Sequence, residues 1–350
     1  MVRNFVLILT IAIGLLSGCS ESGLSTSPGG ARRIDTPVGM IEYLEGRNLP
    51  AMESVRVWEN GYGPGLIITT KHYDIYTTLL EPLMLSLVPG FVESAYLGYQ
   101  DQLGEPVETT GRFKIYLFAQ RSQWDDFTKS FAGPQVNMYR KIKAGAYFLN
   151  GVCVAYNIGR ERTFSVLGHE GWHQFHHGHF KFRLPSWLDE GIATLFENST
   201  ENGGLFSFEP GRNVYRLGAL KKTLIKGRMI PLKELVAINP GEVLATNQSD
   251  AVAAFYGQAY ALVRFMREES YGKWLRNYRQ LLLDGVRGNW PISAGDKTIA
   301  ADRSIPLTVW WNRRVGPQLF QYYISEDFDQ IEQDYLIFCR KIVYHVHFKK

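Results

Sequence analysis

The sequence predicts an α+β protein, with a mixed or antiparallel sheet in an N-terminal lobe and a mostly helical C-terminal lobe. Residues 112–118 alternate apolar and polar side chains, as a half-buried strand does. Asn150-Gly151 separates two short apolar runs, which is the strongest short-range signal for a β-hairpin. In contrast, residues 251–267 and 325–342 repeat apolar side chains at helical spacing.

The first 18 residues predict an export signal. Arg3 precedes an apolar run over residues 5–16, which is too short to cross a bilayer. Residues 16–19, LSGC, are similar to a bacterial lipobox, which implies cleavage before Cys19 and lipidation of its thiol. Several acyl chains on one residue would make a stable anchor. We therefore expect a lipid-anchored protein of the bacterial cell envelope, at the periplasmic face of the outer membrane (favoured by Ser20) or at the cell surface. The alternative is an ordinary secretory signal.

Composition indicates how the rest of the chain is organised and which partners it can have. Residues 19–35 are rich in Ser, Gly and Pro and predict a flexible tether. We expect the lobes to span residues 36–200 and 201–350. The formal charge falls from +4 to +3 when Arg3 leaves with the signal, which is too small to indicate a nucleic-acid partner. Cys153 and Cys339 fit either a disulfide or buried free thiols.

Several further elements of the N-terminal lobe follow from local patterns. The expected strands are residues 66–70, 112–118, 146–149 and 152–156. The expected helices are residues 73–87, kinked or divided by Pro82, residues 122–131, capped by Ser122, and residues 163–178. A Gly-rich stretch over residues 201–212 predicts a loop at the mouth of the site.

The helix over residues 163–178 contains the motif HExxH. His169 and His173 lie four residues apart, so both imidazoles face one side of a helix and can bind one ion. Glu170 is placed one step around the helix, beside a metal-bound water. Two neutral nitrogens, an open coordination position and a carboxylate base are what a zinc hydrolase needs.

A second segment, residues 185–193, offers the missing ligand. Ser186 is expected to cap a helix, with Asp189 as an acid at its start. Five apolar side chains then follow at helical spacing: Trp187, Leu188, Ile192, Leu195 and Phe196. Glu190 falls outside that apolar set. A short connection between the two helices would bring its carboxylate to the ion, giving a His₂Glu site with water as fourth ligand.

HExxH followed by Trp-Leu-x-Glu-Gly-x-Ala resembles the gluzincin metallopeptidases, and in particular the bacterial peptidase-MA-like families. The resemblance implies a zincin-like fold, Zn²⁺ as cofactor, Glu190 as third ligand and a peptide or protein as substrate. The Gly-x-Met-Glu-Asn element of aminopeptidase N-like enzymes is absent just upstream, so aminopeptidase specificity is unsupported. We expect an endopeptidase, and hydrolysis of another amide is the alternative. In the family, an edge strand beside the active-site helix binds extended substrate, a role that falls here to a strand within residues 146–156. The alternative is a hairpin that only supports the helix.

The C-terminal lobe supplies a candidate oxyanion donor. Tyr256, in the helix over residues 251–267, matches the region from which the family places such a donor, with Tyr260 as second choice. The alternative is that both are core aromatics. Further helices are expected over residues 271–283 and 325–342.

Other residues near HExxH have simpler interpretations. His176, His177 and His179 are expected to be exposed or to support the metal ligands at the end of the helix, rather than to collect metal themselves. Gly171 costs about 1 kcal/mol against Ala inside a helix, which close approach of substrate or a neighbouring strand would explain.

The expected mechanism is zinc-dependent hydrolysis of a peptide bond. Glu170 takes a proton from the attacking water and passes it to the leaving amine. Two other classes remain open: a non-catalytic lipoprotein with a structural zinc, which needs a fourth protein ligand such as His176, and a binding or scaffold protein with an occluded cleft.

Overall fold

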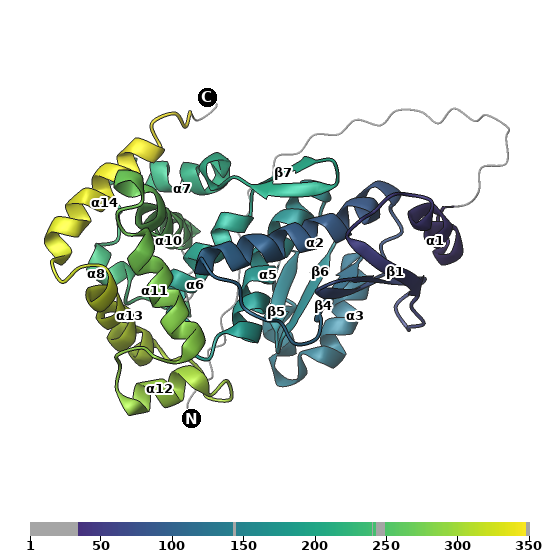
Figure 1. The fold of residues 1–350 in the computed structure, drawn as a ribbon, viewed down its shortest axis with the longest axis horizontal. Coiled ribbons are helices and arrows are strands. Elements are labelled where there is room, and N and C mark those ends of the chain that lie inside the picture. The colour runs from purple at the N-terminus through teal and green to yellow at the C-terminus, as the bar shows by residue number, and fades with distance from the viewer. Residues whose placement is uncertain (1–33, 143–144, 240, 243–248, 348–350) are drawn as a thin grey trace.

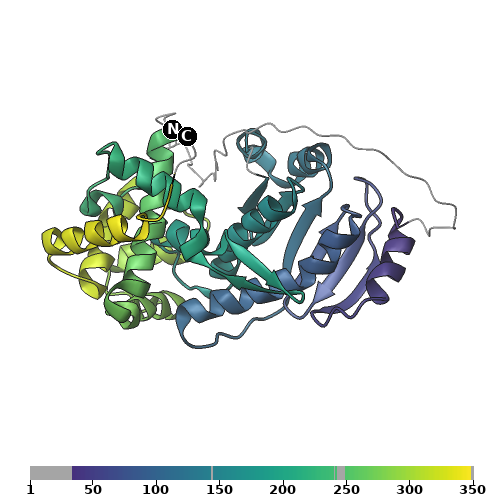
Figure 2. The same ribbon diagram turned by 90° about the horizontal axis from the view of Figure 1, so that it is seen from above.

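The computed structural model describes residues 34–142, 145–239, 241–242 and 249–347. The expected signal over residues 1–18, Cys19 and nearly all of the tether lie outside these residues. The described part is an α+β protein with its sheet in the N-terminal half and helices in the C-terminal half, as predicted (Figures 1 and 2). No helix within it has the length and apolar character that a membrane span requires.

The N-terminal half is built from the following elements: α1 (Pro37–Glu45), β1 (Met52–Val57), β2 (Leu66–Thr70), β3 (Tyr73–Thr77), α2 (Pro82–Leu103), β4 (Phe113–Phe118), α3 (Arg121–Phe131), α4 (Val136–Tyr139), β5 (Ala146–Leu149), β6 (Val152–Tyr156), α5 (Arg160–His179) and α6 (Ser186–Ala193). The predicted strands are confirmed, and the predicted helix over residues 163–178 begins three residues early, at Arg160.

The strands of the larger sheet lie in the order β1-β2-β3-β4-β6-β5. β3, β4 and β6 run parallel, whereas the β1–β2, β2–β3 and β5–β6 pairs are antiparallel. Successive side chains of a strand point to opposite faces of the sheet, so the sheet separates two parts of the core. Cys153 and Ala155 belong to the core that includes α2 and α5, and Val154 and Tyr156 pack with Trp124 of α3 on the other face. β5 is left as the edge strand beside α5.

The predicted helix over residues 73–87 is wrong in its first part. Residues 73–77 form β3, in which buried and partly buried side chains alternate. The alternation has a period of two residues, but a run this short and apolar fits a helix as well as a strand. Pro82 does not divide a helix but begins α2, where Glu81 caps the amides of Leu83 and Met84.

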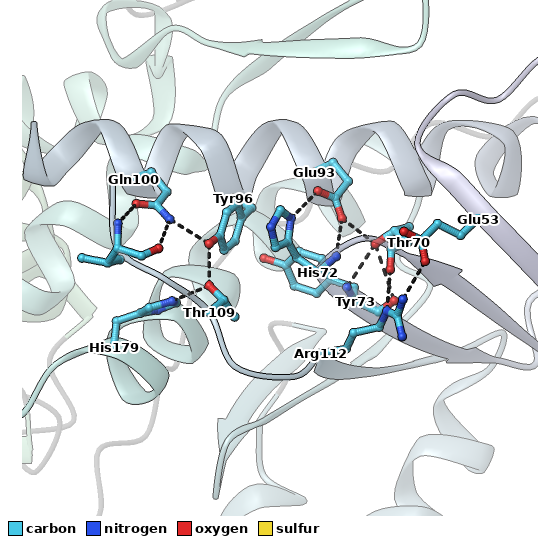
Figure 3. Close-up of polar contacts among 11 residues, drawn as sticks. Glu53, Thr70, His72, Tyr73, Glu93, Tyr96, Gln100, Thr109, Arg112 and His179 are labelled. Atoms are coloured by element: carbon cyan, nitrogen blue, oxygen red, sulfur yellow. Dashed lines mark hydrogen bonds and ion pairs between the residues drawn. The ribbon is translucent and has the colours of Figure 1, made fainter. Parts of the chain in front are cut away.

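A chain of polar contacts joins α2 to the end of α5 (Figure 3). His179 accepts a bond from the Thr109 hydroxyl at 2.6 Å, and Tyr96 of α2 meets the same hydroxyl at 2.5 Å. The Tyr96 ring stacks on His72, whose Nδ1 lies 2.6 Å from a Glu93 carboxylate oxygen. This network fixes the C-terminal end of the helix that carries HExxH.

The remaining elements are β7 (Ser199–Asn202), β8 (Leu205–Phe208), α7 (Val214–Ile225), α8 (Leu232–Leu235), α10 (Ser249–Glu268), α11 (Leu275–Arg287), α12 (Ala294–Ala301), α13 (Val309–Tyr323) and α14 (Phe328–Ile342). Short 3₁₀ turns cover residues 133–135, 194–196, 210–212 and 269–271. The predicted helix over residues 251–267 is confirmed. The lobe boundary expected after residue 200 falls within β7.

Three predictions in this half need correction. The loop expected over residues 201–212 is largely a β-hairpin, which packs on α2 through β8. α11 starts at Leu275 rather than 271, because Ser270 and Tyr271 take positive φ values of 48° and 58°. α14 starts at Phe328 because Asp327 caps it, accepting from the amide of Gln330 at 3.0 Å.

Candidate metal centre

HExxH lies in the middle of α5, where the helix is covered on several sides. His169, Glu170 and His173 are all buried, with at most 7% of each residue exposed. The spacing of four places the two imidazoles in contact, with ring centroids 5.1 Å apart. The short α5–α6 connection leads into α6, which packs on both α5 and α10.

α6 brings Glu190 to both imidazoles. Its Oε2 lies 3.4 Å from His169 Nε2 and 3.8 Å from His173 Nε2. One ligand atom from each of these three residues lies within 4.8 Å of the other two. A tetrahedral site with bonds of 2.0–2.1 Å needs ligand atoms about 3.3–3.4 Å apart, so the three residues fit one small ion with little movement.

The ligand atoms themselves indicate a missing cation. His169 Nε2, His173 Nε2 and both Glu190 oxygens are buried and have no hydrogen-bond partner. Buried polar atoms are nearly always paired, because an unpaired one costs roughly 1–3 kcal/mol. Four such atoms pointing at a common space are explained by an ion that binds there. The residues at this centre could therefore hold a metal ion.

Behind His169 lies a buried carboxylate. Glu197 Oε1 accepts from His169 Nδ1 at 2.9 Å, which leaves Nε2 free for the ion. Arg216 of α7 and Asn213 in turn hold Glu197, with bonds of 2.7 Å from Arg216 Nε and 3.0 Å from Asn213 Nδ2. Although burial opposes its ionisation, the Arg216 guanidinium lowers the pKa of Glu197 to about 2.

Asp189 is an acid in the first turn of α6, as predicted, and it also supports His173 in the same way as Glu197 supports His169. Its carboxylate lies 3.3 Å from His173 Nδ1 and 3.1 Å from His176 Nδ1, and accepts from Trp172 Nε1 at 2.8 Å. Although burial opposes its ionisation, the two histidines hold its pKa well below the usual range. Its contacts with the two histidines were not predicted, because the position at the helix start already explained an acidic residue there.

The carboxylates around the two imidazoles raise the pKa of both histidines. Burial alone would lower the pKa of His173, but Asp189 and Glu190 raise it to about 10. Burial likewise opposes protonation of His169, and the carboxylates of Glu190 and Glu197 raise its pKa. Two clustered carboxylates thus make this centre attractive to positive charge, and a divalent cation supplies that charge while displacing the protons.

Glu170 opens onto a cavity of about 790 Å³ beside the three ligands. Glu170, His173 and Glu190 line the cavity, as do Phe148 and Leu149 of β5. Burial raises the pKa of Glu170, although the two imidazoles and a backbone hydrogen bond from Phe148 oppose the rise. Glu170 Oε1 has no partner. A buried carboxylate with one open oxygen at a cavity is suited to proton transfer.

β5 presents its free edge to this cavity. The two-residue turn at Asn150 and Gly151 pairs Leu149 with Val152, and the amide of Tyr156 bonds to Gly145 at 2.8 Å. Alternate residues of β5 therefore bond to β6. The amide and carbonyl groups of the others, Ala146 and Phe148, point away from β6.

The two candidate tyrosines of α10 differ in the hydrogen bonding of their hydroxyl groups. Tyr256 Oη is buried and has no partner, and the pKa of Tyr256 is raised mainly by burial, then by Glu190. Tyr256 thus lies near the ligand set, although it does not line the cavity. Tyr260 Oη bonds to the carbonyl of Pro210 and to Arg264, which is a structural role.

Three local predictions around the motif are corrected. Ser186 is the first residue of α6 and not its cap. Its amide and hydroxyl bond instead to Asn312 of α13 at 3.0 and 3.1 Å. The hairpin over residues 199–208 does not line the cavity. A Cβ on Gly171 would lie 2.4 Å from Tyr99 Oη of α2, so this glycine admits a neighbouring helix rather than a substrate or a strand.

The other histidines and the cysteines support the fold. His176 is buried, and both its nitrogens are engaged, Nδ1 by Asp189 and Nε2 by the amide of Leu184 at 3.1 Å. His177 and His179 are half-buried. Cys153 and Cys339 are both buried free thiols.

Comparison with known proteins adds no relative. No family model matches the chain, and no curated protein matches it in sequence.

Proposed function

We propose that this protein is a zinc-dependent peptidase of the gluzincin type that acts as an endopeptidase. One observation carries the proposal: His169, His173 and Glu190 turn unpartnered ligand atoms to a common point, while Glu170 stands beside them with an open oxygen at a cavity. A structural site has no use for this last carboxylate. Two imidazoles and one carboxylate form a donor set typical of catalytic zinc.

When bound, the zinc ion supplies Lewis-acid activation of water and of the substrate carbonyl. Side chains of the protein carry out the proton transfer and stabilise the oxyanion. Glu170 accepts the proton of the attacking water and donates it to the leaving amine. Its raised pKa moves it from an ordinary carboxylate towards a group that both takes and returns a proton. Tyr256, with its unpartnered hydroxyl, is the candidate donor to the developing oxyanion.

Substrate binds as an added strand on β5. The outward-facing amide and carbonyl of Ala146 and the carbonyl of Phe148 lie on the strand that lines the cavity, and main-chain bonds of this kind bind a peptide in extended form. Proline at position 146 removes one amide that faces away from β6, and such positions tolerate proline. Ala146→Pro should raise KM with a small change in kcat and in Tm. Leu149→Pro, which breaks the ladder to β6, should unfold the hairpin.

The geometry argues against a closed structural zinc. His176 is the histidine best placed in sequence to complete four protein ligands, but Asp189 and the amide of Leu184 occupy both its nitrogens. Within the described residues, the ligand cluster contains only His169, His173 and Glu190. A non-catalytic scaffold would gain nothing from a cavity that reaches Glu170.

The test compares metal content with hydrolysis of a peptide library. Wild-type protein should hold one zinc per chain and cleave internal peptide bonds. Glu170→Gln should keep the zinc and lose cleavage by at least about a hundredfold. Glu161→Gln changes an exposed acid on the same helix and should cleave like wild type. Cleavage retained by Glu170→Gln would exclude Glu170 as the base.

We also propose that the chain is an envelope lipoprotein anchored through Cys19, on the strength of its N-terminal sequence. Cys19→Ala should then release the protein from membranes in fractionation and abolish incorporation of labelled palmitate. Membrane retention of Cys19→Ala would contradict the anchor.

A further inference from the structure

Two arginines line the same cavity as Glu170 and His173. Arg183 lies in the α5–α6 connection, and Arg303 lies between α12 and α13. They are 120 positions apart in sequence but meet at the C-terminal end of α5. Neither was identified by any local pattern. Their positive charge has no part in the proposed metal binding or proton transfer, so its presence in this wall requires another explanation.

Both guanidinium groups are held by backbone carbonyls rather than by acids. Arg303 Nη2 donates to the carbonyls of His177 and Phe180, at 2.9 Å each. Arg183 donates from Nη2 to the carbonyl of Asp302 at 2.8 Å, and also to the carbonyls of residues 299 and 300. Within the described residues, neither arginine forms an ion pair with a carboxylate. Arg303 Nε is buried without any partner.

The charge in this wall is therefore weakly compensated. Burial, followed by the nearby Arg303, lowers the pKa of Arg183 to about 10, and Asp302 only partly offsets these two effects. Burial and the nearby Arg303 also lower the pKa of His177 to about 4, which leaves this imidazole neutral at pH 7. Two fixed guanidinium groups in one cavity wall, neither of them in an ion pair among the described residues, form a favourable site for an anion.

The distance from the metal centre limits where the anion lies. His177 follows His173 by four residues on α5, which is about 6 Å along a helix. An extended peptide covers this distance in about two residues. Phe148 of β5 contacts both imidazoles, with ring centroids 6.5 Å from His173 and 5.4 Å from His177. A strand bound to β5 would therefore run along the cavity that the arginines line, close to the bond that would be cut.

We propose that Arg303 and Arg183 form a specificity site for a carboxylate of the substrate, positioned within two or three residues of the scissile bond. The inference rests on the proposed function for its peptide substrate, but recognition of the carboxylate needs no catalysis. The carboxylate belongs either to an acidic side chain or to the free C-terminus of a short peptide. Bidentate contact with a guanidinium favours a planar carboxylate in both cases.

Equilibrium binding to the full-length, zinc-loaded Glu170→Gln variant tests the proposal. The probes are four fluorescein-labelled hexapeptides that share one sequence and differ in Glu against Gln at one position and in a free against an amidated C-terminus. Fluorescence anisotropy should show at least about tenfold tighter binding of a carboxylate-bearing peptide than of its neutral partner. The Glu–Gln pair and the acid–amide pair separate the two sources of the carboxylate. The preference should weaken as salt is raised.

Variants then assign the preference to the cavity wall. Arg303→Met in the same background should abolish most of it, and Arg303→Lys should restore part of it. Arg303 also bonds the end of α5, so Arg183→Met provides a second test that leaves those bonds in place. Arg276→Met, an exposed arginine on α11, is the matched control. Circular dichroism and Tm establish that each variant is folded.

Equal affinity for all four peptides, or a preference unchanged in both Arg303→Met and Arg183→Met, would overturn the proposal. A carboxylate preference in a protein that never cleaves any peptide would support this site while refuting the peptidase. Cleavage by wild type without any carboxylate preference would support the peptidase while refuting this site.

Discussion

Glu197 is predicted to support both the stability of the fold and the affinity for metal, and Glu197→Gln separates these roles. The carboxylate accepts from His169 Nδ1 at 2.9 Å, from Asn213 at 3.0 Å and twice from Arg216. The substitution keeps the shape but removes the charge that compensates Arg216, which is only 3% exposed. Leaving one partner of a buried ion pair uncompensated costs about 3–5 kcal/mol.

The metal should be bound less tightly for a different reason. Without the carboxylate, His169 loses the acceptor that fixes its ring and its tautomer, and such losses weaken metal affinity by about 10–100-fold. Urea denaturation of the metal-free protein measures the first effect, and competition with a chromophoric zinc chelator measures the second.

A double variant distinguishes the two effects. Glu197→Leu with Arg216→Met replaces the ion pair by apolar groups, which is often neutral for stability. The double variant should therefore recover much of the lost stability while its zinc affinity stays low. Zinc affinity within about twofold of wild type in Glu197→Gln would refute the orienting role. A stability loss below about 1 kcal/mol would refute the importance of the buried pair.

Three more predictions follow from particular contacts. Gly168→Ala should destabilise the protein by roughly 1–3 kcal/mol despite the better helix propensity of Ala. The reason is that the new Cβ would lie 2.3 Å from the backbone oxygen of Phe196. A higher urea midpoint in this variant would contradict the close packing. The folded protein keeps His177 neutral down to about pH 4, whereas the unfolded residue takes up a proton near pH 6.5. Stability should therefore fall as the pH drops from about 6.5 to about 4, and His177→Gln should flatten that fall in urea titrations across this range; an unchanged slope would be contrary evidence. Tyr256→Phe should lower kcat by about 10²–10³-fold with unchanged zinc affinity if the hydroxyl binds the oxyanion, and wild-type kinetics would assign Tyr256 to the core.

Local patterns in the sequence predicted those structural features that depend on residues close together in the chain. The spacing of His169 and His173 fixes a shared helix face, and Asn150-Gly151 fixes the hairpin, with φ values of 51° and 81°. Glu190 was identified through the resemblance to gluzincins. The run over residues 73–77 was misassigned because a short apolar segment fits a strand and a helix equally well.

The rest depends on contacts between distant segments. Glu197 meets His169 across 28 positions, and nothing near it in sequence marks a carboxylate that supports a ligand. Its one signal was weak: it is the first polar side chain after the apolar run that ends at Phe196. Arg183 and Arg303 share one wall only because α5, α6 and the segment before α13 meet there. Such pairs follow from tertiary packing, which periodicity does not encode.

Zinc binding to Glu190→Gln tests the central claim most directly. Isothermal titration of the metal-free protein should give one zinc per wild-type chain. Glu190→Gln should lose more than the roughly 10–100-fold affinity expected for a residue that only supports a ligand, while Glu161→Gln should match wild type. A Glu190→Gln variant that binds one zinc with wild-type affinity would show that the carboxylate is not a ligand, and the proposed peptidase centre would fail with it.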